Sequence, residues 1–279
     1  EKLEAVVIVG TPKMHYEIGS YCLEKGLHIF VEKPSALTVE KAKKLAMKAD
    51  ENNKFGQVGH FLRHSPALFL AKEISYSKEF GTPVMIFAKY FTNGPWEPRK
   101  SWELDDLFWT YMLVQGVHLV DISRHFMGEV IGLNAKKHKS KSGRPMFSAN
   151  LQFQSGSLGC LSFNASSPNW QTSIDIVGDK PSFLKVDNGV DLFYDNKDNW
   201  ADNFLYDEEV ISLESTEDNS YSNQVFYGYY SEFKHFAECI RNNTPPMPDL
   251  WDEYKALDIC KSIIESSETG HHVDMQLQG

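Results

Sequence analysis

Residues 27–34, with the sequence LHIFVEKP, constrain the fold more than any other stretch of this chain. The apolar residues 27–31, bounded by a glycine and a proline, predict a short buried strand. A run without polar alternation is typical of a parallel strand that helices cover on both faces. Ligands of open parallel sheets bind at the carboxyl ends of the strands, which is where Glu32 and Lys33 lie. An isolated Glu-Lys-Pro, however, more often marks a surface ion pair.

The flanking sequence repeats the pattern of a strand followed by a helix. Residues 5–9 predict a second buried strand and residues 55–61 a third. Between the strands, Gly26 is placed to end one helix and Thr38 to begin the next. We expect the first helix to bury Met14, Ile18, Tyr21 and Cys22, and the second to bury Ala42, Leu45, Ala46 and Ala49. This order predicts a doubly wound α/β sheet, of which only a part is present.

The rest of the chain follows a different pattern. Alternating apolar residues at 147–153, 158–163, 183–186 and 190–194 predict two hairpins, around residues 155–157 and around Asn188-Gly189. A strand at 84–91 and helices at 66–76, 226–240 and 249–268 complete a mostly antiparallel α+β domain. Residues 196–223 are polar and acidic, and we expect a surface excursion there with a strand near 210–213. We therefore predict two domains, residues 1–64 and 65–279, with the helix at 249–268 packing near the first.

Composition excludes several classes of function. A formal net charge of −10 argues against nucleic acid as a partner, and the basic cluster at residues 136–144 is typical of a solvated edge strand and loop. No apolar run approaches the roughly 20 residues that a membrane helix needs. The four cysteines are far apart, without metal-ligand spacing, and no signal-peptide pattern is present. We expect a cytoplasmic protein without a metal site or a membrane partner.

A series of motifs occurs in a characteristic order along the chain. The motifs are Gly10-Thr11-Pro12 with His15, Glu32-Lys33-Pro34, Gly59-His60-Phe61-Leu62-Arg63 before Pro66, Gly116-Val117-His118 before Asp121, Phe233 with Phe236, and residues 266–273. No single motif is specific, but their order and spacing resemble one known family. The chain is similar to the Gfo/Idh/MocA oxidoreductases, which include glucose–fructose oxidoreductase and inositol dehydrogenase.

The resemblance implies an enzyme that passes hydride between NAD or NADP and a sugar, a cyclitol or a related polyol. Lys33 matches the family lysine that reaches the nicotinamide ribose and the reacting hydroxyl, and His118 matches the family histidine that moves the hydroxyl proton. Burial can bring an ammonium toward neutrality, and imidazole titrates in a suitable range. The alternative for His118 is a buried structural histidine. The remaining expected contacts are Gly10, Thr11, Pro12, His15, Glu32 and Pro34 with the cofactor, and Arg63, Trp102 and Asp121 with the substrate.

One position departs from the family pattern. Where many members have an aspartate, one helical turn before the histidine, this chain has Val114, which cannot accept a proton. His118 then works with Lys33 alone, or Asp105, Asp106 or Asp121 substitutes, or the protein is altered or inactive. We therefore also consider a non-catalytic family member that binds a ligand or acts as a scaffold.

The usual start of a dinucleotide-binding domain is also missing. No Gly-x-Gly-x-x-Gly follows an opening strand, and the sequence begins four residues before what resembles the fourth strand of the family. We expect the natural protein to be longer at its N-terminus, and the isolated chain to expose an apolar sheet edge. The resemblance further implies a homo-oligomer, either a dimer or a tetramer, paired through an open face of the second-domain sheet.

Overall fold

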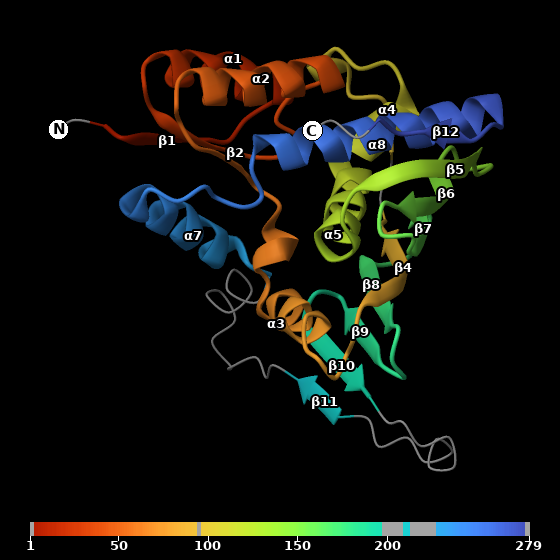
Figure 1. Cartoon of the computed structure of the whole chain (residues 1–279). Coiled ribbons are helices and arrows are strands. Elements are labelled where there is room, and N and C mark those ends of the chain that lie inside the picture. Colours follow the sequence, from red (N-terminus) through yellow and green to blue (C-terminus); the bar gives the residue numbers. More distant parts are fainter. Residues whose placement is uncertain (1–2, 94–95, 197–208, 213–226, 277–279) are drawn as a thin grey trace. The chain divides into compact units, whose positions relative to one another are not determined.

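The structure is a computed structural model that describes residues 3–93, 96–196, 209–212 and 227–276. The chain divides into two compact units, each built from three separate segments (Figure 1). The first unit holds Glu1–Phe61, Glu97–Asp121 and Tyr230–Lys261, and the second holds Leu62–Trp96, Ile122–Tyr229 and Ser262–Gly279. The expected domain division between residues 64 and 65 stays a prediction.

The first unit contains a three-stranded parallel sheet. Its strands are β1 (Ala5–Ile8), β2 (His28–Val31) and β3 (Gly56–Val58), in the order β1-β2-β3. The helices that follow or cover these strands are α1 (Pro12–Glu24), α2 (Val39–Glu51) and α7 (Tyr229–Asn242), with η2 (Lys100–Trp102), α4 (Leu107–Tyr111), η3 (Met112–Gly116) and the first parts of α5 (Val117–Met127) and α8 (Leu250–Thr269). The predicted α/β arrangement is confirmed.

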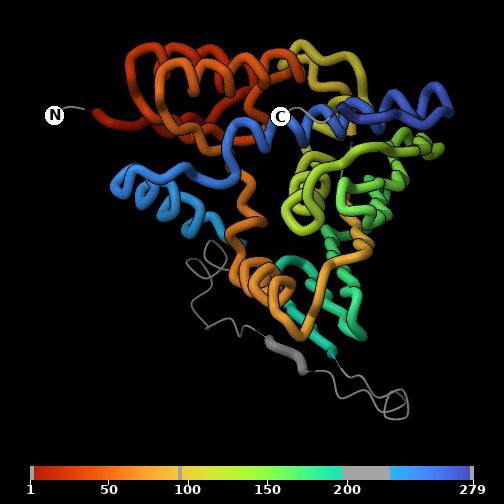
Figure 2. Tube along the Cα trace, viewed as in Figure 1, coloured from red at the N-terminus to blue at the C-terminus, as the bar shows by residue number. Residues whose placement is uncertain are grey.

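Helices cover both faces of this sheet, as the apolar run at residues 27–31 predicts. Ile29 and Val31 pack into one core with Leu45 of α2, and Phe30 points to the opposite face. There the Phe30 ring lies 4.4 Å from the Phe233 ring of α7, centroid to centroid. Figures 1 and 2 show α1 and α2 on one side of the strands and α7 on the other, although α7 is far away in the sequence.

The predicted buried face of α1 is wrong apart from Cys22. Met14, Ile18 and Tyr21 are exposed, whereas the buried face includes His15 and Gly19. A Cβ on Gly19 would lie 3.3 Å from Ile29 and 3.4 Å from Leu45, so the helix approaches the sheet through its smallest residue. Apolar periodicity alone misses such a face, because glycine and histidine carry no hydrophobic signal.

The helix boundaries follow the predicted capping residues. The Thr38 side chain accepts a hydrogen bond from the Lys41 amide at the start of α2, and Gly26 follows α1 with a φ of +75°.

The third strand is shorter than predicted, because β3 ends at Val58 and a 3₁₀ turn, η1 (Phe61–His64), replaces its end. Among the described residues, no helix has the length and apolarity needed to cross a membrane.

The second unit contains a nine-stranded, mostly antiparallel sheet with the strand order β11-β10-β9-β8-β4-β7-β6-β5-β12. Among the described strands of this sheet, the only parallel pair joins β4 and β7. The strands are β4 (Pro83–Phe91), β5 (Val130–Lys139), β6 (Pro145–Phe153), β7 (Leu158–Asn164), β8 (Gln171–Gly178), β9 (Phe183–Asp187), β10 (Asp191–Asp195), β11 (Glu209–Ser212) and β12 (Val273–Asp274). This sheet confirms the predicted α+β class.

Both predicted hairpins are present in this sheet. Strands β6 and β7 pair across residues 155–157, and β9 and β10 pair across Asn188 and Gly189. The φ angles of +52° and +74° at Asn188 and Gly189 are those that an Asn-Gly hairpin turn needs. Strand β11 lies at the expected strand near 210–213, and most of the expected excursion at 196–223 falls outside the described residues.

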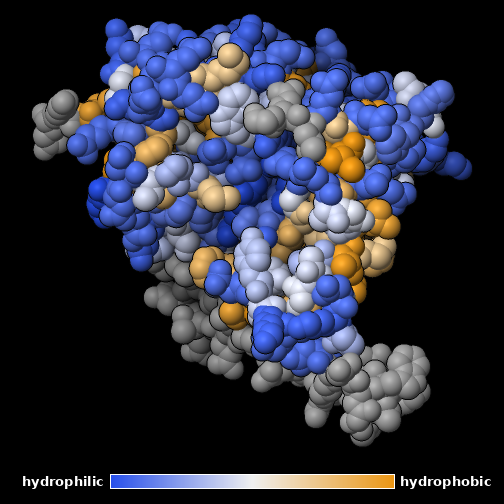
Figure 3. Space-filling view, in the orientation of Figure 1, coloured by the Kyte–Doolittle hydropathy of each residue, from blue (hydrophilic) through white to orange (hydrophobic). Residues whose placement is uncertain are grey.

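One helix covers part of this sheet, and another part carries exposed apolar side chains. Helix α3 (Pro66–Ser75) packs on β9 and β10. Phe87 and Leu158, from the adjacent strands β4 and β7, are exposed, as is Phe183 of β9, which β8 separates from β4. In Figure 3 the visible surface is mostly hydrophilic, with apolar side chains in small separate groups.

Candidate active site

Lys33 lies at the carboxyl end of β2 and is the best-defined member of the candidate site. Its side chain is partly buried, and its Nζ donates a hydrogen bond of 2.6 Å to the carbonyl oxygen of Val114. Burial lowers the pKa of Lys33 to about 8, and the charge of Arg99 acts in the same direction. The charges of Glu32 and Glu253 oppose this shift. An ammonium of this kind can change protonation near neutral pH.

The position of Val114 explains how Lys33 finds a partner without the family aspartate. Val114 lies in η3, a π-helical turn between α4 and α5. In a π-turn the backbone hydrogen bonds connect residues five apart, so the ordinary helical pairing is interrupted there. The backbone carbonyl of Val114, and not its side chain, contacts the Lys33 ammonium. The sequence could not indicate this contact, because every residue has a carbonyl group.

His118 lies in the first turn of α5 and is buried, with 4% of its surface exposed. Its ring centroid lies 5.2 Å from that of Phe61 and 6.2 Å from that of His60, both edge-on. Burial lowers the pKa of His118 well below its usual 6.5, and the neighbouring charges of Lys33 and His60 lower it further. His118 is therefore a neutral imidazole at physiological pH, which is the form that accepts a proton.

A buried network next to His118 includes residues that sequence reasoning did not select. His60 Nε2 lies 2.6 Å from Glu253 Oε2, and His60 Nδ1 lies 3.8 Å from Asp121 Oδ2. The other Glu253 oxygen accepts a 3.0 Å hydrogen bond from the Ser35 amide. His60 belongs to a motif that the sequence shows, but Glu253 is one of many acidic residues on the last helix. Only the packing of α8 against residues 33–35 distinguishes it.

The loop after β1 is tied to the Lys33 segment through His15. The Gly10 amide donates to His15 Nε2, and His15 Nδ1 lies 2.9 Å from the Pro34 carbonyl oxygen. A carbonyl can only accept, so Nδ1 carries the hydrogen and His15 is neutral. Burial lowers the pKa of His15, which agrees with this state. The structure thus brings together the expected cofactor residues Gly10, His15 and Pro34.

Two more of the expected cofactor residues shape the helix that follows. The Thr11 side chain accepts from the Met14 amide as the N-cap of α1, and Pro12 opens the helix. The amino end of α1 and the carboxyl end of β2 therefore meet at this loop. Backbone amides at a helix start favour a ligand with acceptor groups. These residues fit the nicotinamide end of a dinucleotide, and no Gly-x-Gly-x-x-Gly for its pyrophosphate occurs in the 279 residues.

The expected substrate residues fall in different places. Asp121 is buried beside His60. Trp102 lies in η2, where the Arg99 guanidinium stacks 4.6 Å from its ring centroid. Arg63 is buried in η1, within the second unit. Of the aspartates considered as substitutes for the missing acid, Asp106 caps α4 by accepting from the Phe108 amide at 2.8 Å.

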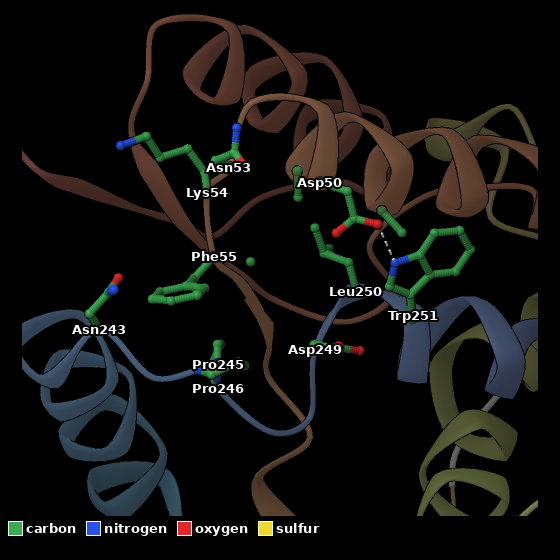
Figure 4. Close-up of a pocket in the computed structure, with 13 residues that line it drawn as sticks. Asp50, Asn53, Lys54, Phe55, Asn243, Pro245, Pro246, Asp249, Leu250 and Trp251 are labelled. Atoms are coloured by element: carbon green, nitrogen blue, oxygen red, sulfur yellow. Dashed lines mark hydrogen bonds between the residues drawn. The ribbon is translucent and has the colours of Figure 1, made fainter. Parts of the chain in front are cut away.

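A cavity of about 620 Å³ lies at the amino end of β3, away from the Lys33 site (Figure 4). None of the expected site residues lines it. Its walls include Lys54, Phe55, Asn243 and Trp251, and the Trp251 indole donates to Asp50. Ligands of open α/β sheets bind at the opposite, carboxyl ends of the strands, which is where the candidate site at Lys33 lies. Within the described residues, no group of three or more His, Cys, Asp or Glu side chains could hold a metal ion.

Two family models together match nearly the whole chain. Residues 1–60 match the oxidoreductase family, NAD-binding Rossmann fold, and residues 76–275 match the C-terminal alpha/beta domain of the same family. The chain belongs to the Gfo/Idh/MocA oxidoreductase family. The first match covers the three strands of the parallel sheet and includes His15 and Lys33.

Characterised relatives agree with this assignment. The scyllo-inositol 2-dehydrogenase (NAD(+)) of Bacillus subtilis (strain 168) is 24% identical over 293 residues, covering 99% of this chain and 79% of that enzyme. The inositol 2-dehydrogenase of Rubrobacter xylanophilus is 25% identical, covering 97% and 74%. Among solved structures, a dehydrogenase from Chromobacterium violaceum superposes with a TM-score of 0.87 at 21% identity, covering 97% of this chain and 78% of that one. A levoglucosan dehydrogenase in complex with NADH and L-sorbose has a TM-score of 0.79 at 20% identity, with 97% and 79% covered.

Proposed function

We propose that this chain carries the nicotinamide half of the active site of an NAD- or NADP-dependent dehydrogenase. Its substrate would be a sugar, a cyclitol or a related polyol, oxidised at a carbinol carbon. The observation that carries the proposal is the partly buried Lys33 at the carboxyl end of β2 together with the buried His118 of α5. Burial lowers the pKa of His118, and the charge of Lys33 lowers it further. The inositol dehydrogenases of similar sequence support the substrate class.

The two side chains have complementary tasks in this reaction. The Lys33 ammonium donates a hydrogen bond to the substrate oxygen and stabilises the negative charge that develops there as the hydroxyl proton leaves. The neutral His118 imidazole accepts that proton. Glu253 holds the His60 ring, which lies edge-on to the His118 ring. A nicotinamide cofactor, held beside Lys33, would supply the hydride acceptor for this oxidation.

Gly10, Thr11, His15, Lys33 and Pro34 would hold the nicotinamide end of this cofactor. Their fit to a cofactor is supported by the hydrogen bonds that connect the Gly10 amide through His15 to the Pro34 carbonyl, because these bonds hold the loop after β1 next to the Lys33 segment. Pre-positioned groups of this kind reduce the entropy lost on binding.

Replacing Lys33 with Met tests the reaction. We expect Lys33→Met to lower kcat for a panel of polyols with NAD or NADP by about 100-fold or more, which is the effect of removing one group that stabilises charge in a transition state. The absorbance of reduced nicotinamide measures the turnover. Lys44→Met, an exposed lysine on α2, is the matched control and should keep full turnover. Undiminished turnover in Lys33→Met would overturn the mechanism.

A binding measurement tests the proposal independently of whether the chain oxidises any of the polyols. Titration with NADH and NADPH, read by quenching of tryptophan emission, should saturate for at least one of the two. Trp109, whose indole donates to the Leu37 carbonyl near the site, is a suitable reporter. If neither cofactor binds and no polyol reacts, the proposal fails for the 279-residue chain.

We propose a homo-oligomer as the functional assembly. The exposed side chains Phe87, Leu158 and Phe183 lie on strands β4, β7 and β9 of the second-unit sheet and offer apolar surface for pairing two copies. Sedimentation of a Phe87→Lys variant would show the loss of that assembly.

A further inference from the structure

Glu253, in the first turn of α8, is a buried carboxyl group with a partner for each of its two oxygens. Its side chain has 0% exposure. Oε1 accepts a 3.0 Å hydrogen bond from the Ser35 amide, and Oε2 lies 2.6 Å from His60 Nε2. A carboxylate is tolerated in the interior where hydrogen bonds replace its lost water. Because an ionised carboxylate only accepts, the hydrogen of the second contact lies on His60 Nε2.

The first contact fixes the peptide group between Pro34 and Ser35, one residue after Lys33. The N–H of this peptide group donates to Glu253, and its carbonyl, which belongs to Pro34, lies 2.9 Å from His15 Nδ1. One peptide group is thus held by α8 through its N–H and by α1 through its carbonyl. A peptide group is planar, so it cannot rotate while both bonds are present. The backbone that carries Lys33 is therefore fixed in orientation.

The second contact fixes the ring of His60 next to His118. The two histidine rings are edge-on, with centroids 6.2 Å apart and an interplanar angle of 89°. The His60 ring is held by α8, whereas His118 belongs to α5, and both side chains are buried. Glu253 therefore connects the backbone next to Lys33 with the ring that lies against His118.

Lys33 also contacts the helical segment that carries His118. Its Nζ donates a 2.6 Å hydrogen bond to the carbonyl of Val114, four residues before His118. The backbone contact with Glu253 and the side-chain contact with Val114 together define where the ammonium lies. A displacement of about 1 Å in a catalytic group can lower a rate by about 100-fold. The length of the Glu253 side chain therefore bears on the rate of the proposed reaction.

We propose that Glu253 is a positioning residue that sets the Lys33 ammonium relative to His118. It does so by holding two partners, the Pro34–Ser35 peptide group and the His60 ring, at a fixed separation. Glu253 acts through these partners and not by contact with the substrate. The catalytic consequence rests on the proposed function, whereas the hold on the two partners does not.

Two conservative variants separate this role from a role of charge, which is the alternative because the charge of Glu253 opposes the lowering of the Lys33 pKa by burial. Glu253→Asp keeps the charge but is one methylene group shorter, so it cannot reach both partners. Glu253→Gln keeps the length without the charge. The Ser35 amide can only donate, whereas an imidazole can carry its hydrogen on either nitrogen. The glutamine oxygen therefore faces Ser35 while its amide donates to His60, and both contacts survive.

The kinetic readout is kcat and KM of the 279-residue chain for a polyol that it oxidises, taken from the plateau of the pH–rate profile. Glu253→Asp should lower kcat by about 10-fold or more and change KM by less than about 3-fold, since a misplaced group weakens the transition state. Glu253→Gln should keep kcat within about 3-fold. Glu265→Asp, at an exposed position of the same helix, is the matched control and should keep both constants. The proposal is overturned if Glu253→Gln loses as much kcat as Glu253→Asp, or if neither variant loses any.

Two readouts by nuclear magnetic resonance do not depend on turnover. In Glu253→Met, which removes both acceptors, the Ser35 amide should exchange with heavy water about 10-fold faster or more than in the unmodified chain. The Ile29 amide of β2, which donates to the Phe55 carbonyl, is the reference for global unfolding and should keep its exchange rate. In Glu253→Gln the Ser35 amide should stay protected, and the hydrogen on the His60 ring should move from Nε2 to Nδ1.

The outcomes of these measurements are distinct. Unchanged protection of Ser35 in Glu253→Met, or an unchanged His60 ring in Glu253→Gln, overturns the proposal even if a polyol reacts. If both signatures are present while no polyol reacts, Glu253 holds its two partners as proposed and the proposed function fails.

Discussion

At the scale of single residues, burial and charge give Lys33 and His118 opposite protonation states. Lys33 has a pKa of about 8 and is mostly an ammonium at neutral pH, whereas His118 has a pKa well below 6.5 and is neutral. In the proposed oxidation of an alcohol, the pair would supply a cation for the oxygen and a base for the proton. Val114, which lacks a proton-accepting side chain, contributes its backbone carbonyl to this arrangement.

These protonation states predict the pH dependence of turnover. The ammonium of Lys33 is present below its pKa, so kcat/KM should fall as the pH rises through about 8. The base His118 is available above its pKa, so the acid limb should lie well below pH 6.5. Steady-state rates measured across roughly pH 5–10 would define both limbs of the pH–rate profile.

Lys33→Arg is the control for the alkaline limb. A guanidinium stays charged over the whole range, so that limb should disappear even though the rate is lower. If turnover of Lys33→Arg still declines near the wild-type midpoint, a group other than Lys33 titrates there.

At the scale of elements, α8 connects the last part of the sequence to the site. Glu253, in its first turn, accepts from the Ser35 amide and lies 2.6 Å from His60, and both of these side chains are buried. A buried ion pair does not by itself indicate a gain in stability, but removal of one partner leaves the other without compensation.

Glu253→Ala should lower the free energy of unfolding by about 3–5 kcal/mol, because a buried histidine and a buried amide both lose their acceptor. Urea denaturation at pH 7 measures the change. Glu265→Ala, at an exposed position of the same helix, should change stability by no more than about 0.5 kcal/mol. Equal stabilities of the two variants would show that the pair does not hold α8 in place.

At the scale of the whole molecule, β1 is an edge strand with an exposed apolar surface. It pairs only with β2 among the described residues, and Val7 and Val9 are 51% and 69% exposed. Met14, Ile18 and Tyr21 of α1, the helix that follows β1, are exposed as well. Figure 3 shows apolar atoms next to the first described residues of the chain. Unpaired edges of this kind associate with other strands.

We therefore expect the 279-residue chain to self-associate in a concentration-dependent manner through β1. The double substitution Val7→Lys and Val9→Lys should shift the sedimentation profile toward monomer, because charged side chains prevent edge pairing. Phe69→Lys, which removes a single exposed apolar side chain from α3, is the control and should not change the profile. An unaltered profile of the double variant would place the contact elsewhere.

Local sequence signals determined much of the fold. Apolar runs without alternation predicted parallel strands, Asn188-Gly189 predicted a hairpin, and Thr38 and Gly26 predicted helix ends. These features depend on the preferences of a few adjacent residues, so they can be read from the chain directly. Together with the order of the family motifs, they predicted the two structural classes and the oxidoreductase family. The roles of Lys33 and His118, the domain division and the cytoplasmic location stay predictions.

Only the tertiary structure decided what depends on residues far apart in the sequence. The buried face of α1, the Val114 carbonyl at Lys33, and the contacts of Glu253 with His60 and the Ser35 amide each arise from packing between distant segments. No local pattern marks them, because a carbonyl group, a glycine or one acidic residue among many becomes distinctive only through its neighbours. The sequence thus determined the elements and the family, and packing determined how the charges of the site act on one another.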